Sequence, residues 1–392
     1  MGNLIKKYAK GDPVIWVIIV VLSIASLLTV YSATGSLAYK YQGGNTSYYM
    51  FKQLISLGAG YVLILFVTNM PYRVFSKYAI LGLYASILLL VVTLASGVNL
   101  NMASRWLTIP ILGITFQPSE LAKLALIIYV AKILAQNQKE KEPASAAFMP
   151  VIGHALIVVA LIFRENLSTA MLLMSVVFAM MYIGRVPFKY LGGTGLVVLV
   201  VVVGVLFMAS KVDFLPRAKT WAARVENYFS PEEVDKESTY QSDQAKIAIA
   251  SGGFFGKGPG NSVQRNFLPH PYSDFIYAII AEEFGMFGAL IILLSYLFLL
   301  GRVGVLVRAS NRTFPAFLAL GLGLMMVAQA FVNMGVAVGI FPVTGQPLPM
   351  VSMGTTSVLF TCVAFGAILS VSRQNMEDKL TPNGAVGAHE ER

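Results

Sequence analysis

Three acidic side chains stand at and just after the start of a long apolar stretch, which reads SDFIYAIIAEEFG. Asp274 comes first, where a membrane-spanning helix is expected to begin, and Ser273 before it is a plausible N-cap. The positive end of the helix dipole is expected to keep Asp274 ionised. An ionised carboxylate at the membrane surface can accept a proton from a hydroxyl group. Asp274 is therefore either an ordinary helix-start carboxylate or a general base.

Glu282 and Glu283 follow about two helical turns later, roughly 12 Å deeper along the same expected helix. Acidic groups inside a membrane are costly, and they usually pair with a basic group or line an interior cavity. Two interpretations stay open for them. They are either a buried structural pair with a Lys or Arg of another helix, or part of the catalytic site.

A second charged pair opens the stretch PSELAKLALIIYVAK. Pro118 indicates a helix start, and Glu120 and Lys123 are spaced so that they share one face of that helix. An ion pair that enters an apolar segment is expensive, which favours a face that lines a polar cavity. A self-neutralised pair at the membrane interface is the alternative.

A glycine-rich run, GGFFGKGPG, surrounds Lys257 in the longest hydrophilic stretch. Glycines allow backbone N–H groups to approach an anion closely, and a lysine adds charge; a flexible turn is the alternative. The pattern GxxxxGK[ST] is absent, so this is no nucleotide-binding loop of that type. The basic residues expected on this side of the membrane, any of which could bind a diphosphate, are Arg105, Arg217, Arg224, Lys246, Lys257 and Arg265.

The composition places these residues in a membrane protein. The chain has 392 residues, of which 56% are hydrophobic and 12% charged, whereas soluble domains are about one quarter charged. We attribute the net charge of +10 to basic loops that face an anionic leaflet, and we expect no nucleic-acid partner. The single cysteine and three separated histidines give no disulfide and no metal-ligand spacing.

The predicted fold is all-α and polytopic, with about ten transmembrane helices and a large extracytoplasmic loop between the seventh and the eighth. About fifteen Lys and Arg residues fall on one side in short loops and about four on the other, which predicts that both termini are cytoplasmic. The expected spans are 14–34, 50–69, 74–95, 119–135, 147–163, 167–184, 189–209, 273–301, 315–341 and 352–372.

A single membrane domain is expected over 1–373, with 210–272 as its large outer loop and 374–392 as a disordered cytoplasmic tail. The last outer loop, 342–351, reads PVTGQPLPMV and carries no charge. Such a loop either dips back into the protein, where protein or water covers its backbone, or forms a rigid connector.

Four motifs together resemble the SEDS family, the shape, elongation, division and sporulation proteins. They read ASRWLTIPILGITFQPSELAK, DQAKIAIASGGFFGKGPG, FLPHPYSDFIYAIIAEEFG and NMGVAVGIFPVTGQPLPMVSMGTTS, and the similarity covers about 14–373. The resemblance implies a peptidoglycan glycosyltransferase that polymerises lipid II at the outer face of the bacterial cytoplasmic membrane. The leaving group would be undecaprenyl pyrophosphate.

The resemblance also implies roles for individual residues. The family's essential aspartate falls on Asp274, and its conserved Glu and Lys fall on Glu120 and Lys123, which are the predicted catalytic residues. The predicted substrate-binding residues are Arg105 and Lys246, which match family motifs, together with Lys257 and Arg224. In two places the chain departs from the family pattern: ENLSTA at 165–170 replaces PDLGTA, and SMGTTS at 352–357 replaces SYGGSS. No family role is carried over to those positions.

Partners and alternatives complete the expectation. We expect a class B penicillin-binding protein, other division or elongation proteins and membrane lipids as partners. The motif FLPHPYSDFIYAIIAEE is more similar to the division branch of the family. No cofactor is assigned; a divalent cation such as Mg²⁺ or Mn²⁺ at the pyrophosphate stays an open alternative, with unknown ligands. A lipid II flippase and a non-catalytic division scaffold are the competing functions.

Overall fold

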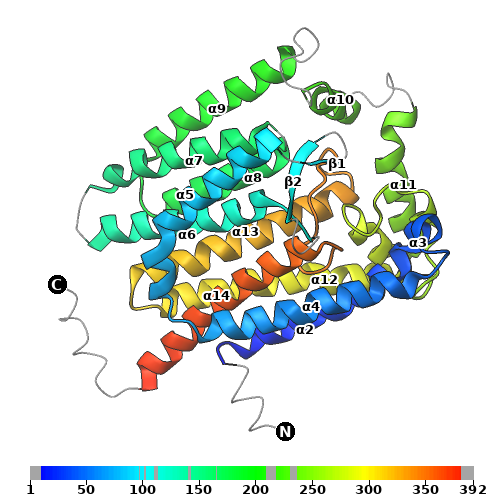
Figure 1. Cartoon of the computed structure of the whole chain (residues 1–392), viewed down its shortest axis with the longest axis horizontal. Coiled ribbons are helices and arrows are strands. Elements are labelled where there is room, and N and C mark those ends of the chain that lie inside the picture. The colour runs from blue at the N-terminus through cyan, green and yellow to red at the C-terminus, as the bar shows by residue number, and fades with distance from the viewer. Residues whose placement is uncertain are drawn as a thin grey trace.

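Long apolar runs must satisfy their backbone hydrogen bonds internally, and here they do so as helices that lie side by side in one bundle (Figure 1). The computed structural model describes residues 10–96, 98–100, 103–109, 114–139, 143–164, 166–208, 218–229 and 236–380. The long helices are α2 (Pro13–Ala33), α4 (Thr46–Asn69), α5 (Arg73–Ser96), α6 (Pro118–Lys139), α7 (Phe148–Phe163), α8 (Leu167–Ile183), α9 (Phe188–Met208), α12 (Ile276–Ala309), α13 (Thr313–Ala337) and α14 (Thr355–Leu380).

Within the described part of the chain, eight helical segments are long and apolar enough to cross a membrane. They are α2, α4, α5, α7 with the short 3₁₀ turn η1 (Ala144–Ala147) before it, α9, α12, α13 and α14. α8 is apolar but shorter, and α6 carries Glu120 and Lys123 in its first two turns. The predicted helical, multi-pass membrane fold is confirmed.

The helices differ in how much of their surface other helices cover. α13 and α14 bury most of their apolar residues, whereas α9 buries only Leu191. Figure 1 shows α13 in the middle of the bundle and α9 at its edge. Polar residues on α13 therefore lie in the protein interior, where each needs a partner.

The described part of the outer loop at 96–118 is not purely irregular, although the protein keeps the predicted all-α class. It contains three short antiparallel strands, β1 (Val98–Leu100), β2 (Ala103–Ile109) and β3 (Ile114–Phe116), in the order β1-β2-β3. In SRWLTI and ITF, β-branched and aromatic residues are frequent, which suits strands. The strands are too short to give a clear alternating pattern in the sequence.

Two other segments differ from expectation. α14 continues to Leu380, so residues 374–380, expected to be disordered, are helical, and 381–392 lie outside the described residues. The large loop at 210–272 contains α10 (Ala218–Phe229), α11 (Lys236–Gly252) and the 3₁₀ turn η2 (Gln264–Asn266), and the earlier loop after α2 contains α3 (Gly35–Tyr41). α10, α11 and α3 cluster at one end of the bundle (Figure 1).

The glycine-rich run packs directly on a break in α12. Gly285 interrupts that helix with φ 67° and ψ −165°. Backbone amides of Lys257 and Gly258 donate to the carbonyls of Glu282 and Glu283 at 3.0 and 2.9 Å. A Cβ on Gly256 would stand 2.2 Å from the Glu283 carbonyl oxygen, so only glycine permits this approach.

Candidate active site

Asp274 lies in a turn before α12 rather than inside its first turn. The helix begins at Ile276, so Ser273 is not its N-cap, contrary to prediction. The Ser273 hydroxyl donates instead to Oδ1 of Asp274 at 2.9 Å, and the Asp274 amide donates to the carbonyl of His270 at 3.2 Å. The chain makes one more turn before the helix starts, so the Ser273 hydroxyl binds the Asp274 carboxylate and not the backbone of the helix.

Burial raises the pKa of the Asp274 carboxyl above its usual range. The Ser273 hydrogen bond and the charges of His270 and Arg224 act in the opposite direction, but burial outweighs them. The helix dipole was expected to favour the ionised form, but desolvation has the larger effect on the pKa because protein groups surround this half-buried side chain. A carboxylate with a raised pKa is a stronger proton acceptor once it is ionised.

The charge-free loop at 342–351 dips back into the bundle, as one of the two interpretations predicted. Gln346, Leu348 and Val351 are all buried. Its backbone is bound from surrounding helices: Ser26 on α2 donates to the Val351 carbonyl at 2.8 Å, and Tyr296 on α12 donates to Pro349 at 2.5 Å. The loop is thus held inside the protein on two sides.

This buried loop places the Asp274 turn. The Ser352 hydroxyl donates to the Ser273 carbonyl at 2.7 Å, and the Met353 amide donates to the Tyr272 carbonyl at 2.9 Å. At Gly345, where φ is +66°, an added Cβ would come within 3.4 Å of Oδ2 of Asp274. The loop backbone therefore forms one wall beside the carboxylate.

Glu120 and Lys123 form the predicted pair at the start of α6. Lys123 Nζ lies 2.8 Å from Oε1 of Glu120, and both side chains are buried. The same ammonium donates to Oε1 of Gln329 on α13 at 3.1 Å. The pair consequently faces the protein interior, which is what the cost of an ion pair in an apolar helix suggests.

Two amides on α13 connect this pair to Asp274, and sequence reasoning did not single them out. Gln329 donates to the Pro347 carbonyl at 2.9 Å. Asn333, one turn further on, donates to the carbonyls of Gln346 and Asp274 at 2.8 and 2.9 Å. Their signal was available: two amides at i, i+4 spacing in an otherwise apolar helix.

The two motifs in which the chain departs from the family pattern also contact this network, through the changed residue Asn166 and through Thr169 and Ser352, which match the family. Asn166 caps α8 by accepting from the Thr169 amide at 3.2 Å. The Thr169 hydroxyl accepts from Gln346 at 2.7 Å, which ties α8 to the buried loop. Ser352, in the other departing motif, binds the Ser273 carbonyl.

Two of the predicted substrate-binding residues flank the segment that leads into the buried loop. Arg224 on α10 donates to the Val343 carbonyl at 3.1 Å, and Lys246 on α11 packs its side chain against Gly339. Burial lowers the pKa of Arg224, and the charge of Asp274 opposes that effect. Lys246 is exposed and lies 3.7 Å from Asp243. Arg105 is on β2, and its side chain lies outside the described residues.

Lys257 and the two deeper acids form a separate cluster. Lys257 Nζ lies 2.6 Å from Oε1 of Glu282, which also accepts from the Ser262 hydroxyl at 2.5 Å and the Val263 amide at 3.0 Å. Glu283 accepts from the hydroxyl of Ser32 and from the Ser262 amide at 3.2 Å. These contacts favour the structural interpretation of Glu282, whose basic partner comes from the glycine-rich run instead of another helix. Glu283 is bound by Ser32 of α2, and its Oε2 has no partner among the described residues.

No three His, Cys, Asp or Glu side chains in the described part of the chain gather into a metal-binding group. Around Asp274 the donors are one carboxylate and the ring of His270. A divalent cation there would have to take most of its ligands from water and from phosphate oxygens, which is how Mg²⁺ is commonly held.

A model of the FtsW/RodA/SpoVE family, described as cell cycle proteins, matches residues 12–377. The chain belongs to this family. Among its members, a "Probable peptidoglycan glycosyltransferase FtsW" of Trichlorobacter lovleyi is 32% identical over 371 residues, covering 93% of this chain and 94% of that protein. A protein of the same name in Saccharophagus degradans is also 32% identical, covering 92% of each chain.

Solved structures of the family share the fold. A chain from a peptidoglycan synthase complex, described as coordinating polymerization and crosslinking, superposes with a TM-score of 0.71. It is 26% identical and covers 94% of this chain and 99% of its own length. The rod shape determining protein RodA of Thermus thermophilus gives a TM-score of 0.65 at 24% identity, covering 93% and 97% of the two chains. The latter likeness concerns the fold alone.

Proposed function

We propose that this protein is a peptidoglycan glycosyltransferase that polymerises lipid II into glycan strands for septal wall synthesis. The observation that carries the proposal is Asp274, a carboxylate with a raised pKa beside a buried loop. The names of the family members at 32% identity support the same activity. The family's association with the cell cycle supports a role in division.

In the proposed reaction the sugar 4-hydroxyl of one lipid II attacks the anomeric carbon of another molecule. A carbon–oxygen bond forms to the acceptor, the bond to undecaprenyl pyrophosphate breaks, and the hydroxyl proton passes to Asp274. Pyrophosphate leaves well without protonation, so the site needs a base and countercharge but no strong acid. A partly buried aspartate with one hydrogen-bonded serine suits the base.

Countercharge is assigned to the basic side chains near the same loop. Arg224 is anchored to the Val343 carbonyl, and Lys246 stands at Gly339, so both can meet a pyrophosphate that lies beside Asp274. Arg105 is proposed for the same role from its motif. Lys123, paired with Glu120, donates to Gln329 on α13, and Gln329 donates to the Pro347 carbonyl of the buried loop. The pair therefore supports the position of that loop.

The orientation and the partner are parts of the same proposal. We place both termini in the cytoplasm and Asp274 at the outer face of the bacterial inner membrane, following the excess of Lys and Arg in the opposite loops. A class B penicillin-binding protein is the proposed partner. The likeness to a chain from a peptidoglycan synthase complex that couples polymerization and crosslinking supports it.

The decisive experiment is polymerisation of lipid II by the purified protein, with a cognate transpeptidase and no other polymerase present. Asp274→Asn and Asp274→Ala should abolish glycan ladders on a gel while the thermal unfolding midpoint is kept. Glu377→Gln, an acid removed at the far end of α14, is the matched control and should polymerise normally. Ladders that persist in both Asp274 variants refute the assignment of the base.

Two additional readouts separate the competing functions. A flippase would move lipid II between leaflets of vesicles without consuming it, and a scaffold would tolerate Asp274→Ala in dividing cells. Parallel reactions with and without a chelator test for a divalent cation that neutralises the pyrophosphate.

A further inference from the structure

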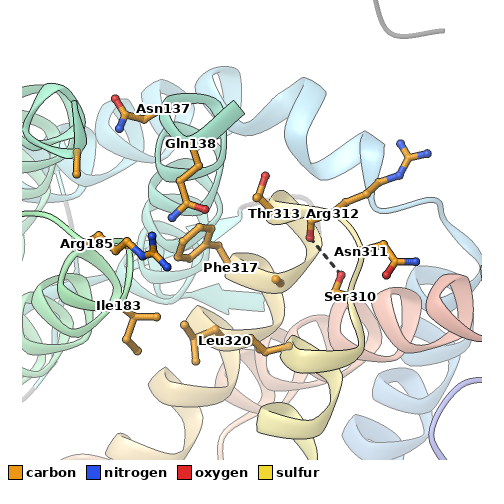
Figure 2. Close-up of a pocket in the computed structure, with 14 residues that line it drawn as sticks. Asn137, Gln138, Ile183, Arg185, Ser310, Asn311, Arg312, Thr313, Phe317 and Leu320 are labelled. Carbon is orange, nitrogen blue, oxygen red and sulfur yellow. Dashed lines mark hydrogen bonds between the residues drawn. The ribbon is translucent and has the colours of Figure 1, made fainter. Parts of the chain in front are cut away.

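A pocket of about 660 Å³ lies at the end of the bundle opposite Asp274 (Figure 2). Three chain turns enclose it: the end of α6, the end of α8, and the turn between α12 and α13. The Ser310 hydroxyl in the last of these turns lies 3.4 Å from Asn375, near the end of α14. The pocket therefore lies at the end of the bundle where α14 ends, and the proposed reaction does not use it.

The described residues that line the pocket include two arginines and no acid. Figure 2 shows the Arg185 guanidinium and the Gln138 amide directed toward each other above Phe317, whereas the Arg312 side chain turns away. α13 also begins here, with no acidic residue in its first turn. The local charge is positive, and its main source inside the pocket is Arg185.

Arg185 occupies a backbone conformation that normally belongs to glycine. Its φ is +65°, and it follows the last residues of α8 in a Schellman-type ending. The Arg185 amide donates to the Tyr182 carbonyl at 3.0 Å, and the Val186 amide donates to Met181 at 3.0 Å. A side chain at this position strains the backbone, so an arginine here points to a use for its side chain.

Several donors in the pocket have no protein partner among the described residues. Arg185 is exposed, and no hydrogen bond or ion pair engages its guanidinium. The same holds for the amides of Gln138 and Asn311. The Arg185 guanidinium and the Gln138 amide, which face each other, can bind a phosphate through charge-assisted hydrogen bonds, whereas Asn311 lies on the opposite side near Arg312 (Figure 2).

Part of the pocket lining is apolar. Phe317 and Leu320 form its floor, and Ile183 reaches from the pocket to the outside of α8, where it is exposed. A polar rim over an apolar floor matches a molecule with a phosphate at one end and a hydrocarbon body at the other. The volume also exceeds what a bare phosphate ion needs and falls in the usual range for small-molecule sites.

We propose that this pocket binds a phosphate ester anion through Arg185 and Gln138. The phosphate can come from the headgroup of an anionic phospholipid or from a soluble phosphate ester. Basic pockets between transmembrane helices commonly bind lipid phosphates on the cytoplasmic side, where the proposed orientation puts this end. The proposal does not depend on glycosyl transfer, and it can fail or hold independently of that function.

The test uses the full-length purified protein and native mass spectrometry. Delipidated protein is offered equal amounts of phosphatidylglycerol and phosphatidylcholine, and retained lipid is counted. Wild-type protein should retain phosphatidylglycerol preferentially, and Arg185→Gly should reduce that retention about tenfold, or about 1.4 kcal/mol. Glycine suits the backbone at this position, so the variant should fold at least as well as the wild type.

A matched control and a second probe make every outcome informative. Arg308→Gln removes one exposed charge from the end of α12, outside the pocket, and should keep the phosphatidylglycerol preference. Glycerol 3-phosphate added to protein in phosphatidylcholine nanodiscs tests the soluble source by a rise in the unfolding midpoint that Arg185→Gly abolishes. Equal behaviour of Arg185→Gly and wild type in both measurements overturns the proposal.

Discussion

Asp274 and Glu282 are close in sequence, yet their carboxylates have opposite environments. Glu282 is fully buried and accepts hydrogen bonds from Lys257, Ser262 and two backbone amides. Asp274 is only partly buried and accepts a single hydrogen bond, from Ser273. The hydrogen-bonding capacity of Glu282 is filled by the protein itself, whereas Asp274 can still accept hydrogen bonds from a substrate.

The comparison shows how an acid near a membrane can be assigned. A carboxylate whose oxygens are saturated by its own chain stabilises the fold, because removal leaves several buried donors without a partner. A carboxylate that is desolvated but little hydrogen-bonded is destabilised in its charged form, and such groups occur at sites of chemistry. By this measure we propose that Asp274 takes part in the reaction and that Glu282 stabilises the fold.

The largest expected difference is in stability. Glu282→Ala should lower the free energy of unfolding by roughly 3 kcal/mol, because it leaves Lys257, Ser262 and two backbone amides without their hydrogen-bond acceptor. Asp274→Asn should leave stability unchanged or raise it slightly: a raised folded-state pKa means that ionisation opposes folding at neutral pH. Thermal unfolding in detergent measures the stability of both variants. The double variant Lys257→Met with Glu282→Met should recover part of the loss. Equal stability of Glu282→Ala and Asp274→Asn would contradict the proposed difference between the two acids.

The next effect concerns Asn333, which positions Asp274 through its backbone. Asn333→Ala removes the donor to the Asp274 and Gln346 carbonyls and should reduce kcat about tenfold, with little change in KM. Glycan synthesis at saturating lipid II is the measurement. Asn69→Ala, at the end of α4, is a matched amide control and should polymerise at the wild-type rate. A change in KM alone would assign Asn333 to substrate binding instead.

A pH profile sharpens the assignment of the base. Activity should fall as the pH is lowered through the raised pKa of Asp274, because only the ionised carboxylate accepts a proton. Arg224 lowers that pKa, so Arg224→Gln should move the acid limb toward higher pH. Lys246→Gln, which removes an exposed charge, should move the limb less than Arg224→Gln does. A limb that is the same in Asp274→Glu and wild type would assign the titration to another group.

The smallest effect is expected at Lys246. Its ammonium is exposed and only loosely paired with Asp243, so Lys246→Gln should raise KM a few-fold and leave kcat and stability unchanged. Initial rates over a range of lipid II concentrations provide the measurement. Lys219→Gln on the neighbouring α10 is the charge-matched control. A large loss of kcat would show that Lys246 acts on the transition state.

Much of this architecture could be predicted because bilayer thickness sets the length of apolar runs. The pairing of Glu120 with Lys123 followed from helical spacing, and the inward course of 342–351 was one of the two interpretations that its lack of charge left open. The start of α12 was predicted too early because Ser273 and Asp274 have the residue types of a helix N-terminus, although they lie in the turn before Ile276.

What the sequence could not show was which distant groups meet. Lys257 had the features of an anion ligand, but its ammonium binds Glu282, a contact that depends on the close approach of the glycine-rich run to α12. Gln329 and Asn333 were missed because polar residues in apolar helices have many possible partners. Such contacts depend on the packing of the helices, which local patterns do not encode.

The interruption of α12 at Gly285 has a consequence for biogenesis. The carbonyls of Glu282 and Glu283 accept from Lys257 and Gly258, so their partners come from a segment earlier in the chain. Because synthesis proceeds from the N-terminus, these donors exist before the broken helix leaves the ribosome. A circular permutant that moved the glycine-rich run behind α12 would have to insert a helix with unsatisfied backbone groups into lipid.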